Sequence, residues 1–431
     1  MPITALGFLA VFSVGCLVAL KRPFVGLLLY FFVFYMHPPG KYWGSFLPEM
    51  RWTLIVAVVT LFSTLIYSKD KMRWLSGTET KFLLCFVVFV FIQWFFVNYP
   101  VVHELYLILL LKLVVLYFLI VTLVNTKKRL LAVIVVNAIC SAYIGLNALQ
   151  THTSGRFEAA GLPGIEDGNL LSIHLVPIIF ISSSILLLKL PKKYFIFLPL
   201  ALTANLLFMT GSRGGIAGLI VAGVFLFVFC PKEIKSVVKR WGLLAVILGL
   251  SLAGPLLLNR LEQAMVPNSE GKIDKSAYSR LVIINSQVEM FKDYPLFGYG
   301  HRGTLNLSIY YIDEEYMTST AVGSRRASHN ITMAYLVDHG LFGFVLIFGA
   351  IVIGILRVRD AKKLFNYGPE EATILLFACS GLVGVIVSSQ FSNSKVLEIT
   401  FWLLALISAT HQLLLENKPE NNKVFKRLKR P

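Results

Sequence analysis

The sequence predicts an all-α, polytopic integral membrane protein with twelve or thirteen transmembrane helices and one large, partly helical loop outside the membrane. Two observations support this fold class. Of the 431 residues, 56% are hydrophobic and only 15% are charged, whereas a soluble domain has about 25% charged residues. Apolar runs of about 17 to 25 residues also recur along the whole chain, and a helix of that length crosses the hydrocarbon core. A single soluble core could not bury so many apolar helices.

The apolar runs define the expected helices in chain order. They lie at 3–20, 23–36, 52–68, 80–97, 104–124, 130–147, 169–188, 193–209, 214–230, 241–258, 334–356, 370–390 and 396–415. The second run is short, so the first two also fit a shallow hairpin, which leaves the number of spans at twelve or thirteen. We therefore expect transmembrane helices in 1–258, an outer loop at 259–333, and further transmembrane helices with a basic tail in 334–431.

The placement of basic residues predicts the orientation. The loops at 21–22, 69–79, 125–129, 189–193, 231–240 and 357–369 and the C-terminal tail hold, with Lys81, 26 of the 40 Lys and Arg residues. The loops at 37–51, 98–103, 148–168, 210–213, 259–333 and 391–395 hold 13. The richer side is cytoplasmic by the positive-inside rule, so the C-terminus is expected inside and 259–333 outside. The net charge of +17 is therefore explained by basic loops on the cytoplasmic side. We expect a lipid bilayer as partner and no nucleic acid.

The outer loop is expected to be ordered. It contains eight basic and eight acidic residues, and Leu281, Ile284, Val288 and Phe291 recur at helical spacing. This spacing gives an amphipathic helix around 277–292. Pro295 and the glycines that follow it are typical of a turn-rich stretch.

Familiar cofactor motifs are absent from the sequence. The letters of 298–303 match G-x-G-x-x-G, but no strand precedes them and no βαβ unit surrounds them, so they do not predict a nucleotide site. The chain has no P-loop and no H-E-x-x-H. We expect neither a metal nor another cofactor.

A short polar turn at 209–215 joins two apolar spans on the expected outer side. Arg213 would lie there at the membrane surface and at the start of a helix, where an Arg is costly unless it is paired or faces a polar cavity. Ser212 and Gly214 flank it, and backbone N–H groups exposed at a helix N-terminus favour an anion. The alternative is an Arg that snorkels and anchors the turn.

Two further residues could join Arg213. Arg280 lies on the amphipathic helix, although a solvated face is the commoner outcome for one isolated Arg. His329 and Asn330 come just before an apolar span, where Ser328 or Asn330 could instead serve as a helix cap. His is the side chain best suited to taking a proton near neutral pH. A His and two Arg at the outer face would suit a phosphorylated lipid head group.

Taken together, these motifs resemble the O-antigen ligase and O-antigen polymerase superfamily. The resemblance rests on Ser212-Arg213-Gly214-Gly215, Ser279-Arg280-Leu281, the stretch 293–300, Ser328-His329-Asn330 and the stretch 335–343. It covers roughly 200–360 by motif and the whole chain by topology. The stretches 21–26 and 36–39 resemble the branch of O-glycosylation ligases associated with exosortase systems.

The resemblance implies a metal-independent, inverting glycosyltransferase of the C-type fold at the periplasmic face of the bacterial inner membrane. Such an enzyme takes a glycan from undecaprenyl diphosphate. The acceptor is lipid A–core in ligases, another lipid-linked glycan in polymerases, and a Ser or Thr in protein-targeted relatives.

By this resemblance His329 corresponds to the essential histidine, and Arg213 and Arg280 correspond to arginines that bind the diphosphate. The expected supporting residues are Ser212, Gly214, Asn330, His301 and Arg302. His329 could act as a general base or only orient the acceptor. His301 and His339 are its competitors for the role of base.

Two other classes of protein remain open from the sequence. A secondary transporter would have a similar number of helices, and Lys112 inside an apolar span is a residue that a transporter could use. It should also show inverted repeats and broken helices near the midplane, which the sequence does not show. A structural scaffold would leave Arg213 and the ordered outer loop unexplained.

Overall fold

The computed structural model describes residues 1–152, 155–158, 160–265, 275–317 and 324–418, and these form helices joined by short connections. Each of the thirteen predicted apolar runs corresponds to a helix. The α-helices are α1 Ile3–Ala19, α2 Pro23–Met36, α3 Trp52–Tyr67, α4 Thr78–Gln93, α5 Pro100–Leu123, α6 Lys127–Thr151, α7 Gly168–Ser184, α8 Phe197–Met209, α9 Arg213–Phe229, α10 Lys232–Met265, α11 Lys275–Asp293, α12 Gly303–Tyr311, α13 Ile331–Lys363, α14 Pro369–Ser388 and α15 Glu398–Glu416.

Short 3-10 helices lie in the connections, and the described residues contain no strand beyond one isolated bridge between Leu162 and Ile165. The 3-10 helices are η1 Pro38–Gly40, η2 Tyr42–Phe46, η3 Arg73–Ser76, η4 Ile185–Leu187, η5 Lys193–Ile196 and η6 Glu314–Tyr316. The protein is thus all-helical, as the sequence predicts. Helix α11 occupies the position of the predicted amphipathic helix, and α10 continues past residue 258 to Met265.

The length and surface of the helices identify a polytopic membrane protein. Six helical segments among the described residues are long and apolar enough to cross a membrane, namely α5, α6, Gly168–Leu187, α13, α14 and α15. Large apolar side chains such as Leu17, Phe62 and Ile220 point outward with 60% or more of their surface exposed. Lipid can solvate such a surface, and a helix can cross the bilayer because its backbone groups are paired internally. Several other apolar helices have 17 residues or fewer, so the number of spans stays a prediction.

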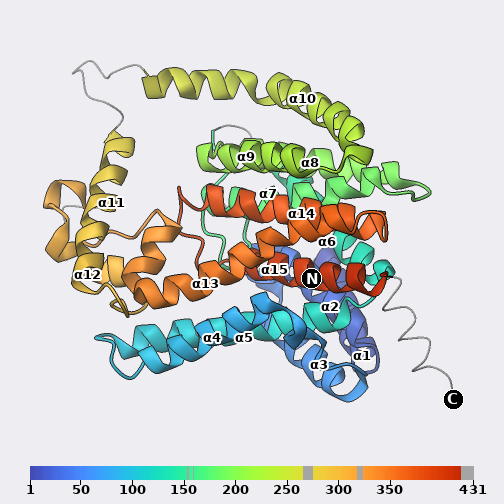
Figure 1. Cartoon of the computed structure of the whole chain (residues 1–431), viewed down its shortest axis with the longest axis horizontal. Helices are drawn as coiled ribbons and strands as arrows, with labels where there is room; N and C mark the ends of the chain where they lie inside the picture. The colour runs from blue at the N-terminus through green and yellow to red at the C-terminus, as the bar shows by residue number, and fades with distance from the viewer. Residues whose placement is uncertain (153–154, 159, 266–274, 318–323, 419–431) are drawn as a thin grey trace.

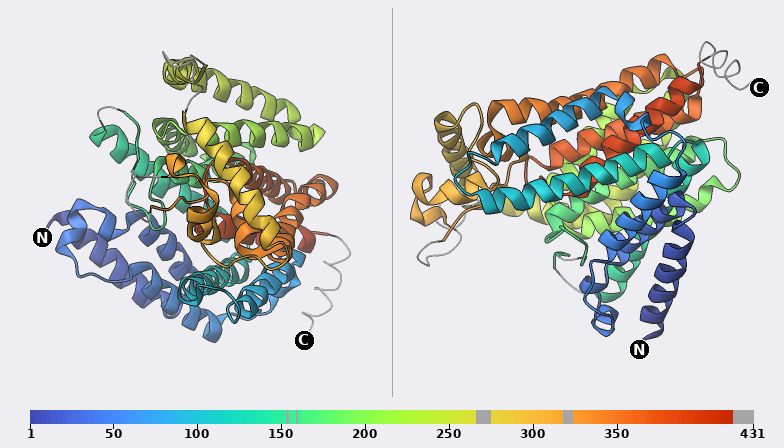
Figure 2. Two further views of the ribbon diagram at one scale, coloured as in Figure 1. Left: turned by 90° about the vertical axis from the view of Figure 1, so that its left-hand side faces the viewer. Right: turned by 90° about the horizontal axis from the view of Figure 1, so that it is seen from below.

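Helix α14 organises the bundle, since it packs against α7, α9, α13 and α15. Helices α1 and α3 form one flank of the molecule, and α10 lies along α9 at another edge (Figures 1 and 2). Helices α11 and α12 gather at one end of the bundle, beside the turn between α4 and α5 (Figure 1).

Several loops that the sequence assigns to the outer side contact one another. The Lys41 Nζ donates to the Ala160 carbonyl at 2.8 Å, which joins the 37–51 and 148–168 loops. The 148–168 loop reaches the 210–213 turn, and the backbone N–H of His301 donates to His103 Nδ1 at 3.1 Å. The 391–395 segment joins them through an ion pair between Lys395 and Asp338.

The loops assigned to the inner side contact one another separately. Arg73 lies 3.5 Å from Glu416 near the C-terminus, His411 lies 2.9 Å from Asp360, and Lys127 pairs with Glu370. The loops joined by these contacts therefore fall into two sets that alternate along the chain. Which set faces the cytoplasm rests on the positive-inside rule alone.

Helix α13 is broken at Gly340, whose backbone has φ 61° and ψ −169°. The segment 294–300, which follows the end of α11, lies against this break. The Tyr299 N–H donates to the Val337 carbonyl at 2.9 Å, and the Leu341 N–H donates to the Pro295 carbonyl at 2.8 Å. The outer segment therefore pairs backbone groups that the break in the helix would otherwise leave unsatisfied.

Candidate functional site

The first turn of α9 begins with a polar cap and two glycines. The Ser212 Oγ accepts a hydrogen bond from the Gly215 N–H at 3.1 Å. A Cβ on Gly214 would lie 2.8 Å from the Cβ of Phe391, so a larger residue would push this turn away from the 389–397 segment. Arg213 is the first residue of the helix and its side chain is exposed. The structure therefore places Arg213 at the start of a helix, as the sequence predicts.

The start of α13 is capped by Asn330. Its Oδ1 accepts from the Met333 N–H at 2.9 Å, which is the capping role that the sequence left open between Ser328 and Asn330. The Ser328 hydroxyl is buried and accepts from the Gln287 side chain of α11 at 2.8 Å. Helix α11 and the residues around His329 are thus held together by hydrogen bonds.

Three charged side chains, those of Arg280, Arg326 and Asp167, act on the charge of His329. His329 is half-buried, and its pKa is lowered from the usual value of 6.5 by burial and then by the positive charges of Arg280 and Arg326. The carboxylate of Asp167, which caps α7, acts in the opposite direction. These charge effects bring Arg280 near His329, as the sequence predicts, and add Arg326 and Asp167, which the sequence did not assign to this group.

The 389–397 segment connects the His329 group to Arg213. The Asn330 side chain donates to the Gln390 carbonyl at 3.3 Å, and the next residue, Phe391, lies against Gly214 beside Arg213. Three helix N-termini, those of α7, α9 and α13, meet this region, and each has a polar cap. Helix N-termini and arginines both favour an anion.

His301 and Arg302 belong to a different cluster. The His301 ring stacks on Tyr106 with centroids 4.4 Å apart, and burial lowers the pKa of His301 far below its usual range. Arg302 has left-handed backbone with φ 62°, and its N–H donates to the Asp338 carboxylate at 3.1 Å, while its side chain is exposed. Their proposed supporting role stays a prediction, because their contacts are to the Asp338 cluster and not to the capped N-termini of α7, α9 and α13.

A buried ion pair between Asp338 and Lys395 lies at the centre of this second cluster. Both side chains are almost completely buried. The carboxylate also accepts from the Gly303 N–H at 2.8 Å, and the Lys395 ammonium lies 4.9 Å from the centroid of the Tyr106 ring. A buried charge is strongly unfavourable unless it is paired. The sequence did contain a signal for this pair. Asp338 lies inside an apolar run and Lys395 lies directly before another, where charged residues are rare.

The competitor His339 is fully buried beside the same pair. One ring nitrogen lies 2.7 Å from the Gln93 amide oxygen, and the Gln93 amide nitrogen donates to the Asp338 carbonyl at 2.8 Å. His339 is therefore enclosed by protein, whereas His329 is only half-buried and lies among charged side chains.

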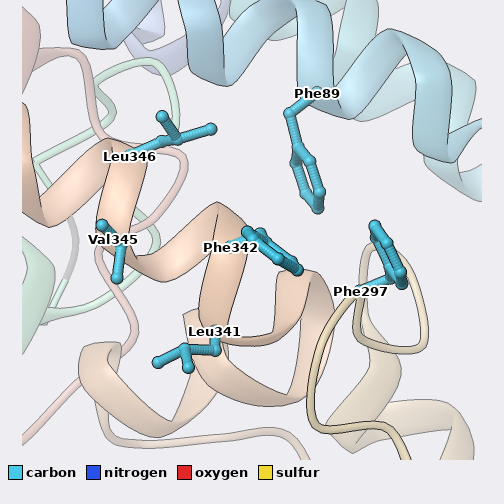
Figure 3. Close-up of a pocket in the computed structure, with 6 residues that line it drawn as sticks. All are labelled: Phe89, Phe297, Leu341, Phe342, Val345 and Leu346. Carbon is cyan, nitrogen blue, oxygen red and sulfur yellow. The ribbon is translucent and has the colours of Figure 1, made fainter.

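A groove of about 400 Å³ opens between α4 and the second half of α13 (Figure 3). Its lining is apolar, and the rings of Phe297 and Phe342 lie with centroids 5.4 Å apart. It is lined by Phe89, Phe297, Leu341, Phe342, Val345 and Leu346. Such a lining suits hydrocarbon and offers nothing to a charged group.

Within the part of the chain that the structure describes, no group of three or more His, Cys, Asp or Glu side chains could hold a metal ion.

Residues 198–348 match the family described as O-antigen ligase, and the match includes Arg213, Arg280 and His329. The chain carries an O-antigen ligase domain. Residues 3–160 match a family of unknown function (DUF5935). No curated protein matches the chain.

The ligase domain contains both parts of the site already described, the capped turn at Arg213 and the residues around His329. This domain supports a membrane glycosyltransferase function of the O-antigen ligase and polymerase type. Lys112, the residue that a transporter could have used, has an exposed side chain on α5 and does not face the interior of the bundle.

Proposed function

We propose that the protein transfers a glycan from undecaprenyl diphosphate to an acceptor hydroxyl at the periplasmic face of the bacterial inner membrane. Lipid A–core is the proposed acceptor. The observation that carries the proposal is the position of Arg213, Arg280 and His329, which lie within an O-antigen ligase domain and near the capped N-termini of α9 and α13.

The donor diphosphate would bind at the two arginines. An Arg guanidinium offers a planar set of donors that matches phosphate oxygens in bidentate fashion. The exposed N–H groups in the first turn of α9 add a favourable partial charge. Charge that develops on the leaving diphosphate would be stabilised by these fixed groups without a metal ion.

His329 would accept the proton of the acceptor hydroxyl. The acceptor oxygen attacks C1 of the donor sugar from the face opposite the diphosphate. The new C1–O bond forms while the bond from C1 to the diphosphate oxygen breaks, and that electron pair leaves with undecaprenyl diphosphate. This geometry inverts the configuration at C1. The lowered pKa keeps His329 neutral near pH 7, which is the form that can take a proton.

The test is a transfer assay with radiolabelled, polyprenyl-diphosphate-linked glycan and purified protein in detergent. Lipid A–core, a second lipid-linked glycan and a Ser- or Thr-containing protein are offered as separate acceptors. Label in lipid A–core supports the proposal. Label only in the lipid-linked glycan or the protein would assign a polymerase or a protein O-oligosaccharyltransferase instead. No transfer to any acceptor would contradict the glycosyltransferase proposal.

A further inference from the structure

A mixed polar and aromatic cavity of about 180 Å³ lies outside the ligase domain. All its lining residues fall between Gly40 and Ala160, within the segment that matches a family of unknown function. The side chains that matter for its chemistry are Lys41, Tyr42, Tyr143, Asn147 and Thr151.

Close backbone contacts hold the loop that forms one wall of this cavity. A Cβ on Gly40 would lie 2.1 Å from the Gly161 carbonyl oxygen, and a Cβ on Gly44 would lie 1.7 Å from the Pro38 carbonyl oxygen. His37 adopts φ 26°, which is unfavourable for a residue other than glycine. The wall is therefore preformed, and strain of this kind tends to be retained at functional sites.

Lys41 places a cation in the cavity wall. Its side chain is half-buried, and its Nζ donates to the neutral Ala160 carbonyl at 2.8 Å. Among the described residues, no carboxylate forms an ion pair with it at 4.0 Å or less. Burial lowers the pKa of Lys41 to about 8. An anionic group in the cavity would compensate the charge that the protein leaves unpaired.

The remaining lining suits a sugar. Tyr42 is 79% exposed and Tyr143 is 37% exposed, so both rings have accessible surface. The Asn147 amide and the Thr151 hydroxyl can exchange hydrogen bonds with sugar hydroxyls. Tyrosines at a membrane interface are common without any ligand, but interfacial anchoring explains neither the cavity nor the cation in its wall.

The segment 155–168 connects this cavity to the ligase site. Phe157 lines the cavity, and its N–H donates to the Met209 carbonyl at 3.0 Å, just before the Arg213 turn. At the other end of the segment, Asp167 caps α7 and acts on the charge of His329. A molecule in the cavity would therefore contact the segment that borders the proposed reaction centre.

We propose that this cavity is the acceptor subsite and that it binds a sugar carrying an anionic group. The assignment to the acceptor rests on the proposed function. The residues proposed to bind the donor lie inside the ligase domain, whereas the cavity lies wholly outside that domain. It is therefore a natural place to recognise the second substrate.

Binding can be tested without the transfer reaction. The protein in phosphatidylcholine nanodiscs is titrated with digalacturonate and with a neutral disaccharide of the same size, and binding is followed by saturation-transfer NMR. We expect a digalacturonate signal that weakens about tenfold in Lys41→Ala, the loss of roughly one charge-assisted hydrogen bond. Lys41→Arg should retain it. Arg51→Ala removes an exposed cation from the same loop and should change nothing. Equal signals for both sugars, or for wild type and Lys41→Ala, would overturn the proposal.

A lipid phosphate is the competing source of the anion. If phosphatidylglycerol nanodiscs suppress the digalacturonate signal, and lipid retention measured by native mass spectrometry depends on Lys41, the cavity is a lipid headgroup site and the proposal fails. An unchanged digalacturonate signal in those nanodiscs supports the sugar assignment.

Kinetics then test the acceptor role. With the acceptor identified by the transfer assay, Lys41→Ala and Tyr143→Ala should raise the acceptor KM about tenfold and leave the donor KM unchanged. Leu146→Ala, an exposed change on the same helix, is the control for Tyr143. A rise in the donor KM instead would refute the acceptor assignment. If the wild-type protein transfers no glycan, the proposed function fails, and the binding measurement decides the cavity independently.

Discussion

His329 differs from its two competitors, His301 and His339, in what surrounds it. His301 and His339 are enclosed by aromatic rings and by the buried network around Asp338. His329 is half-buried and lies among groups of both charges, Arg280 and Asp167 among them. A group that exchanges protons with a substrate needs access as well as a suitable pKa, and His329 has both.

His329→Ala should reduce transfer by about 10²–10⁴-fold, the usual contribution of a general base. The variant should insert and remain monodisperse by size-exclusion chromatography, because the cap of α13 comes from Asn330. His301→Ala and His339→Ala should retain measurable transfer once corrected for the amount of folded protein. Near wild-type transfer by His329→Ala, with either of the other variants inactive, would assign the base elsewhere.

The charges around His329 predict the pH dependence of the reaction. A base must be neutral, so kcat/KM should fall as the pH drops through the pKa of His329, which lies below 6.5. Arg326 disfavours the protonated form, and Arg326→Gln should raise the pKa and shift the acid limb to higher pH. Asp167→Asn keeps a capping side chain and should shift the limb to lower pH. Shifts in the same direction, or no shift, would contradict His329 as the base.

The proposed diphosphate ligands predict a strict requirement for arginine. Arg213→Ala and Arg280→Ala should weaken use of the donor with near-normal expression. Lys in either position should rescue only partly, because it offers a point charge in place of a planar fork. The measurement is the donor concentration that gives half-maximal transfer. Full activity of Arg280→Ala would instead mean that Arg280 is an ordinary solvent-exposed residue with no role in donor binding.

At the scale of elements, the break in α13 is the feature that requires one particular residue. Gly340 has φ 61°, and a Cβ there would lie 2.3 Å from the Leu296 carbonyl oxygen. Gly340→Ala should destabilise the protein by at least about 1–3 kcal/mol. Gly223→Ala in α9 is the matched control, since its Cβ would meet nothing within 4 Å. Thermal unfolding in detergent should separate the two variants, and equal melting temperatures would contradict the account of the break.

The elements themselves were largely predictable because hydrophobic length is a local property. Each apolar run became a helix, and the spacing in 277–292 predicted α11. The break in α13 was not predicted, because a glycine within a long apolar run is also compatible with an unbroken helix. Its unsatisfied backbone groups are paired by residues some forty positions earlier, and no local pattern contains that information.

The grouping of the candidate residues was predictable only in part, because it depends on contacts between distant segments. Arg213, Arg280 and His329 were identified by a family resemblance and by the expense of polar groups at a membrane surface. Arg326 and Asp167 were not assigned to the surroundings of His329, because both are distant from Arg280 in the sequence and no local pattern links them to it. Only the folded chain shows that they act on the charge of His329.

At the scale of the whole molecule, the reaction is predicted to need no metal. Since the described residues hold no cluster of metal ligands, EDTA should leave transfer unchanged within the error of the radiolabel assay. Activity that disappears with EDTA and returns with Mg²⁺ or Mn²⁺ would show that carboxylate ligands had been overlooked. Glu166 and Asp167 would be the first to examine, because they precede the capped start of α7.

The docking of 294–300 against α13 also constrains how the protein is made. This segment precedes α13 in the chain, so the ribosome delivers it first, while its partners at Val337 and Leu341 are still being synthesised. The backbone bonds that close the gap at Gly340 can therefore form only after α13 has entered the bilayer. Until then the break leaves polar backbone groups without these partners, and each such group is unfavourable by several kcal/mol where hydrocarbon surrounds it. This contact therefore forms when a helix made later docks against a segment made earlier.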